Sequence, residues 1–192
     1  MTSYYNKAMV YAYDLIRSVI KKFYWGFVRY SYNPTRYVKK GRHVDFGSRF
    51  RFSREYPYKA YVGVKTNTDE CNIWNAKQGD IVVGHGCWFG LYNILMGPVE
   101  IGNNFSSGPF VSILGPRHPY KKNLEFSNDK TVIGNNVTIA TGSIILFGVR
   151  IGDNVVVSAG SVVNKDIPAN AFVAGNPARD ITRMAAAAWK QE

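Results

Sequence analysis

The sequence predicts an all-β protein, a parallel β-helix built from stacked six-residue repeats. Two observations carry this prediction. Large apolar residues recur at every sixth position in two runs of the chain, and glycine, asparagine or aspartate follows many of them. Self-similarity at a fixed short period is typical of repeat architectures, in which each unit packs on its neighbours.

The two runs of repeats begin at Val83 and at Ile133, with a stretch between them that lacks the period. Eleven of the twelve residues at the first position of the repeat are large and apolar. They are Val83, Phe89, Leu95, Ile101, Ser107 and Ile113, then Ile133, Ile139, Ile145, Ile151, Val157 and Val163. An ordinary β-sandwich, whose strands alternate apolar and polar residues, would not place apolar residues at a constant spacing of six, so this alternative is disfavoured.

The other positions of the repeat indicate a short extended segment followed by a tight corner. Half of the residues after the first position are glycine, and pairs such as Asn103-Asn104 and Asn135-Asn136 come next. These residue types tolerate positive φ and form turns. Small or branched residues occupy most of the fifth positions, namely Cys87, Val99, Val111, Val137, Ser143, Val149, Val155 and Ser161. We therefore expect the first and fifth side chains to point into a shared core, with strands about 4.8 Å apart.

The composition indicates a globular domain with an extension. The chain has 192 residues, of which 46% are hydrophobic and 19% charged, and a chain of this size buries a core without disulfides. Its two cysteines, Cys71 and Cys87, fit a reducing compartment. We find neither a signal-peptide pattern nor an apolar run of membrane-span length. We therefore expect a cytoplasmic protein.

The net charge of +11 is concentrated in the first third of the chain. Residues 1–65 carry 14 Lys and Arg against 3 Asp and Glu, whereas residues 66–192 carry 10 of each. The same first segment holds 17 of the 28 aromatic residues. The sequence therefore predicts a basic, aromatic N-terminal extension ahead of a neutral β-helix.

Residues 4–30 have apolar residues at alternating spacings of four and three, which predicts an amphipathic helix. Residues 38–61 contain only weak pieces of the repeat, so we expect an irregular opening coil there. The basic helix either packs on protein or brings the chain to an anionic membrane surface or an anionic glycan. Nucleic-acid binding would also suit the charge, but no recognition motif accompanies it.

The C-terminal part of the chain carries segments that identify a family. These are Ile151-Gly152-Asp153-Asn154, then the stretch from Ala159-Gly160 through Asn164-Lys165 to Ile167-Pro168, then Gly175-Asn176-Pro177-Ala178-Arg179. On these residues the chain resembles the hexapeptide-repeat acyltransferases. It is most similar to their galactoside and maltose acetyltransferase branch, which includes the O-acetyltransferases of capsule, colanic acid and lipopolysaccharide synthesis.

The resemblance implies a left-handed β-helix with three repeats in each triangular coil, assembled as a homotrimer. We expect the extension over residues 1–65, the β-helix over 66–183 with a loop over 114–131, and a helical tail over 184–192. The implied activity is acetyl-CoA-dependent O-acetylation of a sugar or glycan hydroxyl during polysaccharide synthesis. Acetyl-CoA is then a co-substrate, and no metal is required.

One histidine suits this chemistry. His118 lies where the repeat breaks, ahead of Pro119, and the family has a His-Pro pair in the same place that supplies the general base. A base with a pKa near 7 takes the proton of the acceptor hydroxyl as this attacks the thioester. Glu125 and Asp129 are candidates for orienting the imidazole, but a backbone carbonyl would serve equally well.

The resemblance also implies which residues contact the coenzyme. Backbone N–H groups near Thr141 and Gly142 are expected to stabilise the oxyanion. The remaining matching positions are Ala159, Asn164, Lys165, Arg179 and Arg183, of which the three cations suit the coenzyme phosphates. On the acceptor side Asn93 is the candidate, although its alignment needs a gap.

Several alternatives stay open at this point. An amino-sugar N-acetyltransferase or an antibiotic acetyltransferase would use the same fold and coenzyme. A non-catalytic β-helix assembly subunit would not need His118. A zinc carbonic anhydrase on the same β-helix needs three converging imidazoles. The three histidines, His43, His85 and His118, lack the spacing that would stack them.

Overall fold

The computed structural model describes residues 38–55, 57–115 and 129–188. Residues 1–34 form a unit separate from residues 35–192, and all described residues belong to the second unit. The helix predicted over residues 4–30 therefore lies outside the described residues, as does His118. No helix among the described residues is long and apolar enough to cross a membrane.

Three parallel sheets form the walls of the described unit. The first sheet contains, in spatial order, β1 (Val38–Lys40), β4 (Ala60–Val62), β7 (Ile81–Val83), β10 (Val99–Ile101), β13 (Thr131–Ile133) and β16 (Arg150–Ile151). The second contains β2 (Asp45–Phe46), β5 (Asn67–Thr68), β8 (Trp88–Phe89), β11 (Ser106–Ser107), β14 (Thr138–Ile139), β17 (Val156–Val157), β19 (Phe172–Ala174) and β20 (Arg179–Asp180). The third contains β3 (Arg51–Arg54), β6 (Ile73–Ala76), β9 (Ile94–Met96), β12 (Ser112–Leu114), β15 (Ile144–Ile145) and β18 (Val162–Val163).

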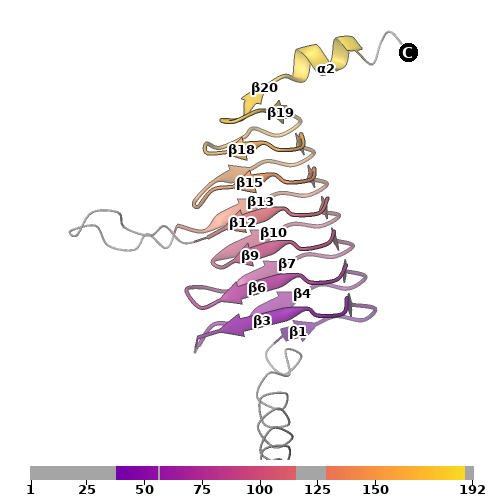
Figure 1. Cartoon of the computed structure of the whole chain (residues 1–192), viewed down its shortest axis with the longest axis vertical. Helices are drawn as coiled ribbons and strands as arrows, with labels where there is room; N and C mark the ends of the chain where they lie inside the picture. The colour runs from indigo at the N-terminus through magenta and orange to yellow at the C-terminus, as the bar shows by residue number, and fades with distance from the viewer. Residues whose placement is uncertain (1–37, 56, 116–128, 189–192) are drawn as a thin grey trace, which may run out of the picture. The chain divides into compact units, whose positions relative to one another are not determined.

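Each successive triplet of strands makes one coil, with one strand in each sheet, and the coils stack along one axis (Figure 1). Only the last pair, β19 and β20, is antiparallel. The helix α2 (Thr182–Ala188) follows β20. The predicted left-handed parallel β-helix is confirmed.

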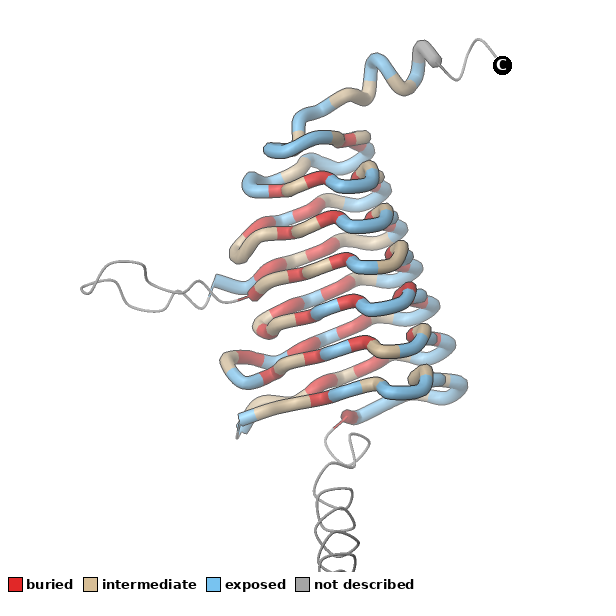
Figure 2. Tube along the Cα trace, viewed as in Figure 1, coloured by how far each residue is buried: buried red, intermediate tan, exposed pale blue. Residues whose placement is uncertain are grey.

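The core follows the six-residue register of the sequence. All twelve residues at the first position of the repeat are buried, and so are the eight fifth-position residues named above. Buried residues alternate with partly or fully exposed ones along the coils (Figure 2). Removing one large aliphatic side chain from water stabilises a fold by roughly 1.5–3 kcal/mol, so the repeat itself supplies the driving force for stacking.

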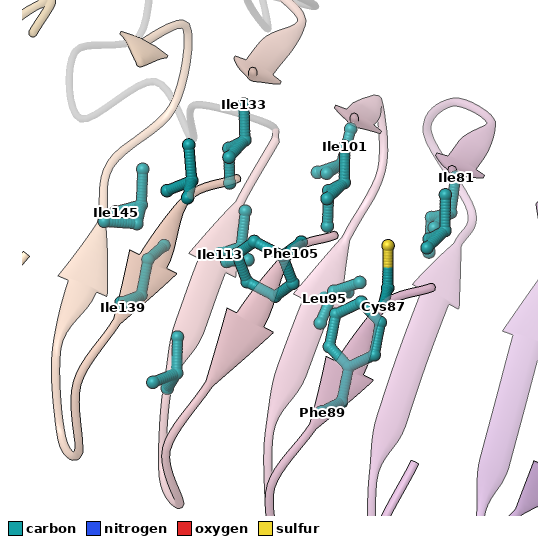
Figure 3. Packing of buried hydrophobic residues seen from close by; sticks show 14 of the residues in the cluster. Ile81, Cys87, Phe89, Leu95, Ile101, Phe105, Ile113, Ile133, Ile139 and Ile145 are labelled. Carbon is teal, nitrogen blue, oxygen red and sulfur yellow. The ribbon is translucent and has the colours of Figure 1, made fainter. Parts of the chain in front are cut away.

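Inside the coils, side chains of the same column touch from one coil to the next. Figure 3 shows Leu95, Ile113 and Ile145 in one such column, and Phe89 beside Phe105, which belongs to the neighbouring column. The centroids of the Phe89 and Phe105 rings lie 5.1 Å apart, and Trp74 packs edge-on to Phe89 at 5.2 Å. The buried aromatic residues among those described, Phe52, Trp74, Phe89 and Phe105, therefore all belong to the N-terminal coils, whereas the core of the later coils is mainly aliphatic.

The β-helix begins at Val38, ahead of residue 66, where we expected it to begin. Val38 pairs with Ala60, and Ala60 pairs with Ile81, in the same parallel register as the later strands. The first two coils are longer because extra residues lie between the third and first sheets, at 55–59 and 77–80. These extra residues break the six-residue period, which explains why residues 38–61 appear irregular in the sequence.

Three edges join the sheets. The first edge, between the first and second sheets, includes residues 84–87, 102–105, 134–137 and 152–155. Its asparagine side chains form a ladder, in which the amide of Asn104 donates to Asn136, that of Asn136 to Asn154, and that of Asn154 to Asn170, each over 3.0 Å. All four residues have positive φ, which asparagine tolerates better than most residues. The ladder therefore holds successive coils in register at this edge.

Candidate functional site

The second edge joins the second and third sheets and carries the predicted oxyanion residues. It includes residues 90–93, 108–111, 140–143 and 158–161. Thr141 and Gly142 form the corner between β14 and β15, and Ala159 and Gly160 form the next corner, between β17 and β18. All four residues are exposed.

Backbone hydrogen bonds fix these two corners against each other. Gly160 N–H donates to the Thr141 carbonyl over 2.9 Å, and Gly142 N–H donates to the Pro109 carbonyl over 2.9 Å. Thr141 N–H makes no hydrogen bond to another described residue, so it remains a candidate donor. A Cβ added at Gly142 or at Gly160 would meet nothing within 4 Å. The edge thus presents bare backbone to a ligand.

Two buried hydroxyls brace the second edge from inside. Ser143 Oγ donates to the Ser158 carbonyl over 2.9 Å, and Ser161 Oγ accepts from Gly175 N–H over 3.2 Å. The second bond joins the last corner to the segment that follows β19. Because both serines are fully buried, these contacts hold the edge in place without forming part of its surface.

The third edge joins the third and first sheets and carries Asn164 and Lys165. Both residues are exposed and follow β18. The loop that contains His118 starts from this edge also, because β12 ends at Leu114 and β13 begins at Thr131. Thr131 Oγ donates to the Leu114 carbonyl over 2.7 Å, so the two ends of the loop are held side by side.

A shallow cleft of ≈ 330 Å³ lies at the third edge, lined in part by Asp80, Pro98 and Lys130. Its charged groups already have partners. Lys130 Nζ lies 2.8 Å from Glu100, and Asp80 accepts from Lys59 N–H over 2.8 Å. Asp129, a predicted orienting residue for His118, precedes Lys130 at this edge.

Arg179 and Arg183 lie at the C-terminal end of the coils. Arg179 is in β20 and donates to the Ala178 carbonyl over 3.0 Å, and Arg183 lies in α2. Arg183 lines a cleft of ≈ 560 Å³ with Asn170, Asp180 and residues next to them. Both guanidinium groups are on exposed residues and are accessible to an anion.

The structure therefore brings together only some of the predicted coenzyme residues. Thr141, Gly142 and Ala159 share the second edge. Asn164 and Lys165 lie at the third edge, on the other side of the third sheet. The two arginines lie beyond both, on the last strand and helix.

Asn93, the predicted acceptor residue, lies inside the second edge and is fully buried. Its amide nitrogen donates to Ser107 Oγ over 2.6 Å, and its amide oxygen accepts from Val111 N–H over 2.7 Å. It occupies the fifth position of the repeat that begins at Phe89, which is a position that points inward. An acceptor role for Asn93 stays a prediction, and it requires this fully buried side chain to become accessible to the acceptor.

Sequence reasoning missed three aromatic residues on and beside the second edge. Tyr92 and Phe110 occupy the corner positions that hold Gly142 and Gly160 in later coils, and Trp88 lies in β8 next to the same edge. All three are exposed. For Tyr92 and Phe110, the sequence did contain a signal: each is a bulky residue at a turn position where the repeat otherwise favours glycine or asparagine.

The described residues offer no group of three His, Cys, Asp or Glu side chains that could hold a metal ion. His85 Nδ1 accepts from Val64 N–H over 2.9 Å and so is already engaged. Burial raises the pKa of the Cys87 thiol, which disfavours its thiolate form. Cys87 is therefore unsuited to act as a nucleophile.

Stacked six-residue repeats with an exposed backbone edge define the class of hexapeptide-repeat proteins. Comparison with known proteins places the chain in the same class. A family model described as bacterial transferase hexapeptide (six repeats) matches residues 130–165. The galactoside O-acetyltransferase of Escherichia coli (strain K12) is 45% identical over 90 residues, which are 45% of this chain and 44% of that protein. The chain spans less than half the length of the curated relatives it matches.

Two solved structures extend the comparison. A maltose O-acetyltransferase from Clostridium difficile 630 superposes with a TM-score of 0.55 at 30% identity, covering 77% of this chain and 71% of that chain. A mutant of AntD, an N-acyltransferase from Bacillus cereus crystallised with dTDP and coenzyme A, gives a TM-score of 0.63 at 18% identity, covering 78% and 91%. The second likeness concerns the fold alone. The chain belongs to the hexapeptide-repeat acyltransferases, in the branch that includes the galactoside and maltose acetyltransferases.

Proposed function

We propose that the protein is an acetyl-CoA-dependent O-acetyltransferase that modifies a hydroxyl of a sugar or glycan in polysaccharide synthesis. The observation that carries the proposal is the bare second edge, where Thr141, Gly142, Ala159 and Gly160 expose backbone with no side chain covering the two glycines. A thioester with a long flexible arm fits such a surface because nothing obstructs close approach. The relatives at 45% and 30% identity are O-acetyltransferases by name.

In the proposed reaction His118 acts as the general base in a direct transfer. The imidazole removes the proton of the acceptor hydroxyl while the hydroxyl oxygen attacks the carbonyl carbon of the thioester. The tetrahedral oxyanion accepts a hydrogen bond from Thr141 N–H. Collapse breaks the carbon–sulfur bond, and the departing thiolate takes the proton from the imidazolium. The products are an acetyl ester and coenzyme A, and no enzyme nucleophile is needed.

The place where the His118 loop leaves the coils, together with the position of Thr141, favours a homotrimer with sites between subunits. The loop that contains His118 starts at the third edge, whereas Thr141 and Gly142 lie at the second edge, and the third sheet separates the two. A neighbouring subunit that presents its third edge to the second edge would complete the site. Closed symmetric assemblies are the usual outcome for such complementary surfaces. Sedimentation equilibrium of the active protein tests this, and an active monomer would contradict it.

The N-terminal coils support contact with an anionic partner in the cytoplasm, either a membrane surface or a glycan. Among the described residues from Val38 to Lys65, eight are Lys or Arg, two are Asp or Glu, and none of the eight cations is buried. Lys39 and Lys40 lie over the rings of Tyr61 and Phe46, each at 5.7 Å from the centroid. Co-sedimentation with neutral and with anionic vesicles, with an anionic polysaccharide as competitor and at two salt concentrations, distinguishes the two partners. The absence of binding to either would leave this segment with a structural role alone.

The test of the activity is a transfer assay on the full chain, with acetyl-CoA and a panel of acceptors. The panel holds maltose, a methyl galactoside, nucleotide sugars, lipid-linked oligosaccharides, polysaccharide and an amino sugar. Mass spectrometry identifies the product, and loss of acetyl in mild alkali distinguishes an ester from the amide of an N-acetyltransferase.

The His118→Ala variant tests the general base in the same assay. We expect kcat to fall by roughly 10²–10⁴ with the fold intact, as measured by far-UV circular dichroism. Near-normal turnover by the folded variant would refute the assignment of His118 as the general base. Failure of the wild-type protein to transfer acetyl or to bind acetyl-CoA would favour the assembly-subunit alternative.

A further inference from the structure

Two aromatic side chains stack on each other at the second edge. Tyr92 lies in the corner between β8 and β9, and Phe110 lies in the corner between β11 and β12, one coil further on. Their ring centroids are 5.2 Å apart and their planes differ by 1°. Tyr92 is 47% exposed and Phe110 is 59% exposed. The pair is therefore formed on the surface, outside the core.

The backbone of both residues is strained. Tyr92 has a φ of 58° and Phe110 a φ of 60°, in the left-handed region that bulky residues avoid. The equivalent residues of the later coils are Gly142 and Gly160, for which such a φ costs little. Arg49 and Cys71 hold the same positive φ in the equivalent corners of the first two coils, so the two bulky rings, and not the φ alone, set the corners of Tyr92 and Phe110 apart. Core packing does not explain the two rings, because they pack outside it.

The aromatic pair adjoins the proposed acyl-transfer site directly. Gly142 N–H donates to the carbonyl of Pro109, the residue before Phe110. The equivalent corner residues of successive coils are therefore Tyr92, Phe110, Gly142 and Gly160. A Cβ built at either glycine would meet nothing within 4 Å, so the space beside the Phe110 ring is open. Since Tyr92 covers one face of the Phe110 ring, and coils repeat about every 4.8 Å, a flat ligand ring fits where the next side chain is missing.

We propose that Phe110 and Tyr92 form an acceptor platform, on which a sugar ring of the acceptor stacks with a hydroxyl directed at the thioester beside Thr141. This proposal rests on the proposed function and names two acceptor-binding residues for it. A pyranose has an apolar C–H face that suits an aromatic ring, while its rim of hydroxyls suits polar neighbours such as Thr141 and Ser106, both exposed. The adenine of the coenzyme is a poorer candidate, since the long pantetheine arm separates it from the reacting thioester.

The platform also accounts for how the acceptor is oriented. An aromatic face holds a sugar ring flat but leaves it free to slide, so the neighbouring polar groups select which hydroxyl reaches the thioester. Trp88, 57% exposed, extends the apolar surface onto the second sheet, where it pairs with Ser106. A second sugar residue of a glycan would contact Trp88. The platform therefore predicts a preference for an oligosaccharide over a monosaccharide acceptor.

The test compares Phe110→Asn with Phe110→Tyr. Asparagine suits the positive φ and removes the ring, whereas tyrosine retains the ring. With maltose as acceptor, we expect Phe110→Asn to raise the acceptor KM about tenfold and to leave the KM for acetyl-CoA unchanged. Phe110→Tyr should behave as wild type. Val64→Ala, which removes an exposed apolar side chain at the first edge, is the matched control.

A second measurement separates the platform from the catalytic proposal. Saturation-transfer NMR with maltose, a methyl galactoside and polysaccharide reports sugar contacts without any transfer. Sugar contacts in wild type that disappear in Phe110→Asn support the platform, even if no acetyl is transferred. Unchanged contacts or KM in Phe110→Asn overturn it, as does the absence of sugar contacts in wild type. A change of oligomeric state in Phe110→Asn with sugar contacts retained would overturn it by showing that the rings form a subunit interface.

Discussion

Gly108 leaves no room for a side chain beside Thr141. A Cβ added at Gly108 would lie 2.7 Å from the backbone nitrogen of Thr141 and 2.8 Å from its hydroxyl oxygen. Thr141 belongs to the corner that we assign to the oxyanion, and Gly108 belongs to the coil before it. The glycine therefore sets how closely the two coils approach at the proposed site.

The variant Gly108→Ala should displace the Thr141 corner. Two of the three nearest obstructing atoms, the nitrogen and the Cα of Thr141, belong to the backbone, so they cannot move aside as the end of a flexible side chain would. We expect a loss of roughly 1–3 kcal/mol in the free energy of unfolding, and a KM for acetyl-CoA raised several-fold. Urea denaturation and steady-state kinetics measure the two effects.

Gly84→Ala is the matched control for this prediction. Its Cβ would lie 2.6 Å from Gly102 and from the Asn103 side chain, at the first edge and away from Thr141. It should lose similar stability while the KM for acetyl-CoA stays unchanged. Equal effects of both variants on that KM would show that Gly108 acts through stability alone.

The six-residue register could be predicted because each coil repeats the same contact. Aliphatic residues in columns such as Leu95, Ile113 and Ile145 are buried where the sequence places them. The register also places Asn93 inward, where it is fully buried, whereas its assignment to the acceptor site rests on a gapped alignment and stays a prediction. Period alone therefore gives the direction of a side chain more reliably than a gapped alignment.

The remainder could not be predicted, for two physical reasons. Extra residues at the third edge shift the period in the first two coils, whose core holds Phe52 and Trp74 in place of the later aliphatic residues. The stacked pair of Tyr92 and Phe110 comes from separate coils at corner positions, where residue type predicts a turn but not which exposed side chains meet.

The asparagine ladder predicts a stability effect far from the second edge. Asn136→Ala removes one bond to Asn104 and one to Asn154, and places alanine at a φ of 55°. We expect a loss of roughly 1–3 kcal/mol. Asn136→Gly relieves the backbone and should lose less. Urea denaturation compares the two, and equal losses would show that positive φ contributes nothing.

The three cations assigned to the coenzyme phosphates predict a selective effect on affinity. Lys165→Ala, Arg179→Ala and Arg183→Ala should each raise the KM for acetyl-CoA roughly tenfold, because a charged hydrogen bond is lost. The KM for S-acetyl-pantetheine, which lacks the nucleotide phosphates, should not change. Lys77→Ala, on an exposed residue of the second coil, is the control. A cation whose loss affects both thioesters equally has another role.

The two cysteines should differ in their reaction with a thiol reagent. Cys87 is 2% exposed, and burial raises the pKa of its thiol, whereas Cys71 is partly exposed at the second edge. At pH 8 we expect one thiol to react in the native protein and both to react in denaturant. Cys71→Ser should transfer acetyl at the wild-type rate, because direct transfer uses no thiol. Loss of activity in that variant would instead indicate a covalent route.

The start of α2 predicts a dependence on acid pH. The Thr182 hydroxyl and backbone N–H both donate to the Asp180 carboxylate, over 2.6 and 2.8 Å, and they lower the pKa of Asp180, with a smaller effect from Arg183. A lowered pKa in the folded state means that the carboxylate stabilises the helix start above the ordinary pKa of aspartate, about 3.9. That contribution is lost as the pH falls through the lowered value.

Two measurements check the direction of the Asp180 pKa shift and its effect on the start of α2. Carbon-13 NMR should show Asp180 titrating below the ordinary value in wild type and in Thr182→Ser, but nearer to that value in Thr182→Ala, which lacks the hydroxyl. The Ala185 N–H, which donates to the Ile181 carbonyl over 3.0 Å in the first turn, should lose protection from exchange at the same low pH. Titration of Asp180 above its ordinary value, or protection of Ala185 that does not depend on pH, would show that the carboxylate does not hold the helix start.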